Sequence, residues 1–144
     1  MRLEVFKETP ARLPIRRLKR LFDMVIRSEG RPGWRGSVNL VICTDARLRS
    51  LNRRFRAHDR ATDVLSFNID RPDQPGAVFG EIYIAAPSVR RQARAHGRGV
   101  FGEYLLLVCH GLLHLTGYDH DTRSKERVMF SRQAHYLERL AGGR

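Results

Sequence analysis

Apolar and polar residues recur with two different periods along this chain, and the change of period predicts an order of strands and helices. Residues 1–7 alternate as an edge strand does, and Pro10 ends that pattern. From Pro14 to Gly30 the apolar residues return every three or four positions, which predicts an amphipathic helix. After a turn-rich loop, the apolar run 38–42 predicts a buried strand.

The middle of the chain predicts a short helix followed by a hairpin. Thr44 is a suitable cap for a helix that ends near Phe55. Segments 62–67 and 78–84 are rich in β-branched and aromatic residues and predict two strands. The loop 68–77 between them contains prolines and no helical pattern, so we expect the two strands to pair antiparallel.

Three more helices are expected in the C-terminal half, over residues 86–97, 101–115 and 122–140. In the last of these, the candidates for burial are Val128, Leu137 and Leu140. Strands and helices in this order predict an α+β fold, in which helices cover a mixed sheet of about four strands. We expect residues 1–144 to form a single domain.

The charge of the chain favours a polyanionic partner. Lysine and arginine number 27 against 15 acidic residues, which gives a formal net charge of +12. A field of this sign attracts RNA or DNA over a long range. A membrane surface or a generally arginine-rich composition would give the same count, so charge alone does not separate these readings.

Cysteine content and hydropathy favour a cytoplasmic protein. Cys43 and Cys109 are the only cysteines, which is not a disulfide framework, and Met1–Glu4 lacks the apolar run of a signal peptide. No apolar stretch approaches the length that spans a bilayer, so no membrane association is expected.

Three of the six histidines have a spacing typical of a metal site. His110 and His114 lie four residues apart, and so on one face of the expected helix. Gly117 can end that helix in a left-handed conformation and reverse the chain, which would return His120 to the same point. Three convergent imidazoles form the ligand set of an open, catalytic zinc site at the C-terminal end of a central helix.

The same histidine spacing occurs in zinc proteases, with one difference. In those enzymes a glutamate follows the first histidine and acts as the general base. Here that position is Gly111. The metal geometry is therefore retained without the protease base, which disfavours peptide hydrolysis and leaves another hydrolytic reaction open.

Several motifs together resemble the YbeY family of metallo-endoribonucleases, also called rRNA maturation factors. They are His110 to His120, Thr62 to Phe67, Leu51-Asn52 before Phe55-Arg56, Gly80-Glu81-Ile82 and Gln92-Ala93. The chain departs from the usual family pattern at Glu81, where aspartate is common, and at Gln133, where an acidic residue is common.

The resemblance implies cleavage of single-stranded RNA with one zinc ion held by His110, His114 and His120. It also implies a role in maturing the 3′ end of small-subunit (16S) rRNA and in ribosome quality control, with the small ribosomal subunit as partner. Arg56 matches the family arginine that lies by the metal and contacts substrate, where a guanidinium can offset charge on the transition state.

The proton acceptor is left open at this stage. Glu103 is seven residues before His110 on the expected helix, although an acid near a helix start also stabilises the helix dipole. Asp63 is an alternative, and Asp119 is another that can instead orient a ligand histidine. If the RNA 2′-hydroxyl attacks, no water is needed. A non-catalytic, zinc-stabilised rRNA-binding factor and a zinc hydrolase of another substrate class are the competing hypotheses.

Overall fold

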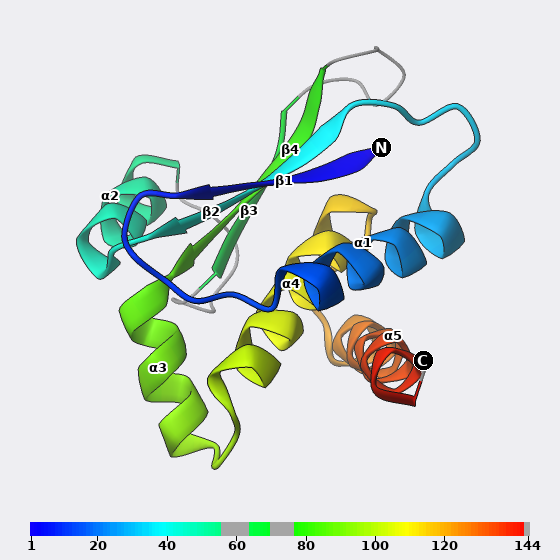
Figure 1. Ribbon diagram of the computed structural model, residues 1–144. Helices are drawn as coiled ribbons and strands as arrows, with labels where there is room; N and C mark the ends of the chain where they lie inside the picture. Colours follow the sequence, from blue (N-terminus) through cyan, green and yellow to red (C-terminus); the bar gives the residue numbers. More distant parts are fainter. Residues whose placement is uncertain (56–63, 70–76, 143–144) are drawn as a thin grey trace.

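The computed structural model describes residues 1–55, 64–69 and 77–142. Its elements in chain order are β1 (Arg2–Lys7), α1 (Ile15–Glu29), β2 (Ser37–Cys43), α2 (Asp45–Phe55), β3 (Val64–Asn68), β4 (Val78–Ala85), α3 (Ala86–Ala95), α4 (Val100–Leu115) and α5 (Arg123–Gly142) (Figure 1). The strand and helix order expected from the sequence is confirmed within these residues.

The four strands form one mixed sheet in the order β1-β2-β4-β3. β1 and β4 pair parallel with β2, one on each side, while β3 pairs antiparallel with β4. The expected antiparallel pairing of the two central segments is therefore correct. The start of the predicted strand at Thr62 and Asp63 lies outside the described residues.

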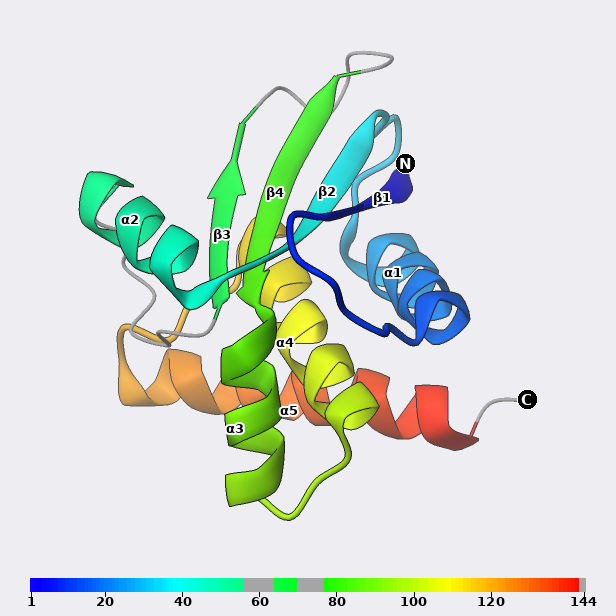
Figure 2. The same ribbon diagram turned by 60° about the vertical axis from the view of Figure 1, so that its left-hand side comes forward.

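Alternating side chains place a separate apolar cluster on each face of the sheet. Leu40, Ile82 and Ile84 belong to the larger cluster, which the sheet shares with α1, α3, α4 and α5. Leu65 and Tyr83 belong to a smaller cluster shared with α2. Figure 2 shows α2 apart from the other helices, beside β3. The sheet thus separates α2 from α4, although both helices contact β3.

Helix α4 is the central helix of the larger cluster. It packs against α1, α3, α5, β3 and β4, and buried side chains occur around its whole circumference. A helix that is apolar all round is stable only where neighbours cover every side. Within residues 1–55, 64–69 and 77–142, no helix has the length and apolar character needed to cross a membrane.

One burial prediction in α5 is wrong. Val128 is 54% exposed, whereas Met129, Tyr136 and Leu140 face the core. The inward residues recur at intervals of seven and four, and Val128 precedes this stripe by one residue, which rotates it about 100° away. Leu140 is buried as expected, and Leu137 packs partly buried against the same cluster.

Candidate metal centre

Three imidazoles converge beyond the last turn of α4, as the spacing predicts. His110 and His114 project from the helix and His120 from the segment that follows it. The ring centroids are 4.8 Å apart for His110 and His114, 5.4 Å for His110 and His120, and 5.0 Å for His114 and His120. One nitrogen of each ring lies within 4.8 Å of the others.

These nitrogens fit the demands of a single metal ion. Zinc binds imidazole nitrogen at about 2.0–2.1 Å, so two nitrogens on one ion can be no more than about 4 Å apart. The separation of up to 4.8 Å is slightly larger than this limit, so the rings would have to move closer together to bind one ion. No fourth histidine, cysteine or carboxylate joins the group within the described residues, which is the donor set of an open site.

The chain reverses direction after α4 because Thr116 and Gly117 end the helix. Thr116 donates its hydroxyl to the carbonyls of Leu112 and Leu113, at 3.1 and 3.0 Å. Gly117 has φ of +114°, in the region that favours glycine. The Tyr118 amide then donates back to the Leu113 carbonyl at 2.9 Å, and the chain turns toward the two helical histidines.

Gln133 of α5 contacts the first histidine. Its Oε1 lies 3.2 Å from Nδ1 of His110, which makes Nδ1–H the donor and Nε2 the nitrogen with a lone pair. In the sequence, Gln133 is visible only as a departure from the family pattern. Its role depends on how α5 crosses α4, which the residue spacing does not reveal.

The glycine at the protease base position has a steric reason. A Cβ at Gly111 would lie 3.0 Å from Cδ1 and Cγ2 of Ile82 and 3.0 Å from Oγ of Ser66. This side of α4 faces the sheet rather than the histidines. Any side chain larger than glycine at this position would therefore require Ile82 or Ser66 to shift.

The acidic candidates have different locations. Asp119 Oδ1 accepts a hydrogen bond from the backbone N–H of His120 at 2.7 Å, so it orients that histidine through the main chain. Glu103 is buried two turns before His110, with Oε1 at 3.6 Å from His96 Nδ1 and 3.7 Å from Arg98. The structure does not bring Glu103 into the group of His110, His114 and His120.

Two sequence candidates, Arg56 and Asp63, lie outside the described residues. At the family departure Glu81, Oε1 accepts a hydrogen bond from the Tyr83 hydroxyl at 3.1 Å, and Tyr83 belongs to the apolar cluster on the α2 face of the sheet.

Both cysteines are buried free thiols. Burial raises the pKa of Cys109 and of Cys43 to about 12, so neither is a thiolate near neutral pH. Cys109 is thus the small buried residue that its position beside His110 predicts, and it is absent from the group of metal donors.

Residues 6–141 match a family model that is described as "Endoribonuclease YbeY". A relative of that name from Chlorobaculum tepidum is 34% identical over 97% of this chain and 98% of its own length. Another, from Anaeromyxobacter dehalogenans, is 42% identical over 73% of this chain. That match spans 54% of the relative, about half its length.

A solved structure has the same fold. The solution structure of a Thermotoga maritima protein is 31% identical, with a TM-score of 0.63 over 97% of this chain and 89% of that one. Fold, histidine cluster and sequence similarity agree, and the chain belongs to the YbeY family.

Proposed function

We propose that this protein is a zinc-dependent endoribonuclease that cuts single-stranded RNA. Within that activity, we propose maturation of the 3′ end of 16S rRNA on the small ribosomal subunit, ribosome quality control, and a cytoplasmic location. The convergence of three imidazole nitrogens within 4.8 Å is the observation that carries the proposal. The family's description as an endoribonuclease supports the reaction class.

Charge and aromatic surface support RNA as the substrate. The chain carries a net charge of +12, and the exposed side of α2 bears Arg47, Arg49, Arg53 and Arg54. Phe55 ends this helix with 53% of its surface exposed, and the Arg54 guanidinium lies 5.3 Å from its ring centroid. Basic side chains beside exposed aromatic rings are typical of surfaces that bind unpaired nucleotides, because bases stack on the rings.

The chain's own residues prepare the site for hydrolysis of a phosphodiester. A bound zinc ion would supply Lewis-acid stabilisation and lower the pKa of water. Gln133, through its Oε1, would favour the His110 tautomer that has its lone pair on Nε2. Arg56 is proposed to offset the charge of the transition state. Because Glu103 lies elsewhere, the proposed proton acceptors are Asp63 and Asp119 for attack by water, while attack by the RNA 2′-hydroxyl is the other route.

The test is cleavage of an end-labelled single-stranded RNA by wild-type protein and by His110→Ala, with zinc content measured on both. We expect one zinc per chain and cleavage in the wild type, and loss of both in the variant. His135→Ala is a matched control, because His135 is an exposed histidine on α5.

Cleavage by His110→Ala at the wild-type rate would reject the proposal. Tight RNA binding by the wild type without any zinc-dependent cleavage would favour the non-catalytic assembly factor instead. Affinity that does not change with salt would argue against RNA as the ligand, because binding through several phosphates weakens steeply as salt rises.

A further inference from the structure

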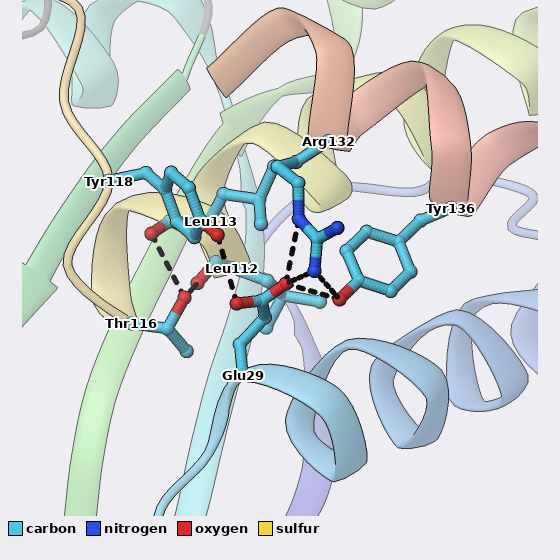
Figure 3. Close-up of polar contacts among 7 residues, drawn as sticks. All are labelled: Glu29, Leu112, Leu113, Thr116, Tyr118, Arg132 and Tyr136. Carbon is cyan, nitrogen blue, oxygen red and sulfur yellow. Dashed lines mark hydrogen bonds and ion pairs between the residues drawn. The ribbon is translucent and has the colours of Figure 1, made fainter. Parts of the chain in front are cut away.

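One carboxylate connects three elements beside the histidine cluster. Glu29, the last residue of α1, accepts hydrogen bonds from Tyr118 in the segment that carries His120 and from Arg132 and Tyr136 of α5 (Figure 3). The Tyr118 hydroxyl is 3.0 Å from Oε1, and Nε and Nη2 of Arg132 are 3.2 and 2.6 Å from Oε2. The Glu29 side chain is 11% exposed.

Glu29 is held as an anion in this position. Its burial acts to raise the pKa, but the hydrogen bonds from Tyr136, Arg132 and Tyr118 outweigh burial and keep the pKa of Glu29 below its ordinary value of 4.5. Hydrogen bonds to a charged acceptor are shorter and stronger than those between neutral groups. The hydrogen bond from the Tyr118 hydroxyl to the Glu29 carboxylate, here called the tether, is therefore strong near neutral pH.

The tether lies next to the third histidine. Tyr118 is two residues before His120, and its ring packs against the larger apolar cluster. Its amide bonds to the end of α4, and its hydroxyl bonds to α1. By contrast, Asp119 bonds to the adjacent backbone of His120, and Asp121 pairs with Lys125 in α5, so neither joins this stretch to α4 or α1.

A single turn of α5 supports two of the three histidines. Arg132 and Tyr136 hold Glu29, which holds Tyr118 and hence the segment of His120. Gln133, within the same turn, contacts the ring of His110. The relative positions of the two imidazoles thus depend on the contact of α5 with α1 and α4.

We propose that Glu29 is a positioning residue for the metal, acting through Tyr118 on the placement of His120. This inference rests on the proposed metal site. Without the tether, the segment after Gly117 has more conformations, and binding of the ion must restrict them. Removing a direct hydrogen-bond partner of a metal ligand changes metal affinity by about 10- to 100-fold, and because this contact acts one step farther out, we expect the lower end of that range.

The experiment measures zinc affinity by competition with a chelating dye, together with the visible absorption spectrum of the cobalt(II)-loaded protein. Tyr118→Phe removes one hydroxyl and keeps the packed ring. We expect its zinc affinity to fall by about tenfold and its cobalt spectrum to change. Glu29→Gln is expected to lower zinc affinity as well.

A double-mutant comparison tests whether the two residues act together. Because Glu29 acts through Tyr118, adding Tyr118→Phe to Glu29→Gln should cost less affinity than it does in the wild type. Asp45→Asn is the matched control, since Asp45 also joins two helices, through Ser88 at 2.7 Å and Arg91 at 2.9 Å, far along the chain from the histidines. Its zinc affinity should equal that of the wild type.

Unchanged zinc affinity in Tyr118→Phe would overturn the inference, and so would an equal loss in Asp45→Asn, which would indicate general destabilisation. Additive effects in the double variant would also contradict it. A wild type that binds zinc but cuts no RNA would reject the proposed function alone, because the affinity comparison would still support the role of Glu29.

Discussion

Adding one methyl group at Gly111 should strain the contact between α4 and the sheet. Its Cβ would be 3.0 Å from two carbons of Ile82 and from Oγ of Ser66, which is closer than ordinary van der Waals contact. Gly→Ala inside a helix gains about 1 kcal/mol of propensity. Overpacking a filled core costs about 1–3 kcal/mol. We therefore expect Gly111→Ala to lower the free energy of unfolding by about 0–2 kcal/mol.

Gly102 provides the matched control on the same helix. A Cβ there would meet only Cγ and Cδ of Arg98, at 3.4 and 3.6 Å, which are ordinary contacts with a flexible side chain. Gly102→Ala should therefore realise the gain in propensity and raise the free energy of unfolding by about 0.5–1 kcal/mol.

Urea denaturation of the metal-free proteins measures both changes, and the decisive quantity is the difference between the two variants. The structure predicts that Gly102→Ala is more stable than Gly111→Ala by about 0.5–3 kcal/mol. Because His110 adjoins the strained position, zinc affinity should fall in Gly111→Ala and stay constant in Gly102→Ala. Equal stabilisation of both variants would refute the steric explanation for the missing protease base.

Three other predictions concern pH, thiols and RNA. The pKa of Glu29 is lower in the folded protein than its ordinary value of 4.5, so the ionised carboxylate stabilises the fold above pH 4.5. That stabilisation is lost as the pH falls through the pKa of the folded state. Urea midpoints should thus fall less on acidification in Glu29→Gln than in wild type, and an identical decline would contradict this. Cys43 and Cys109, with pKa raised to about 12, should not react with a thiol reagent at pH 8 until urea unfolds the protein. Arg54→Ala should make the affinity for single-stranded RNA less sensitive to salt, by the amount that corresponds to about one lost phosphate contact. Phe55→Ala should instead weaken RNA binding by about 1–3 kcal/mol at every salt concentration.

The sequence predicts features that depend on local spacing. The interval between His110 and His114, with Gly117 after them, predicts the converging rings because helical periodicity and a left-handed glycine are local properties. The hairpin was predictable because its connection contains no helical pattern. The predicted burial of Val128 was wrong because a one-residue shift of the buried stripe cannot be recognised in a helix with few apolar residues.

Contacts between distant helices could not be predicted in this way. Gln133 reaches His110 across 23 positions, and Glu29 reaches Tyr118 across 89 and Arg132 across 103. Each of these residues is polar and of a type common on helix surfaces. Only the packing of α1, α4 and α5 shows that these residues meet their partners.

The most direct test of the account is the rate of single-stranded RNA cleavage by metal-stripped protein, titrated with zinc. If His110, His114 and His120 hold the catalytic ion, the rate should rise from near zero and saturate at one zinc per chain. Cleavage by the stripped protein that is as fast as in the presence of zinc would contradict it.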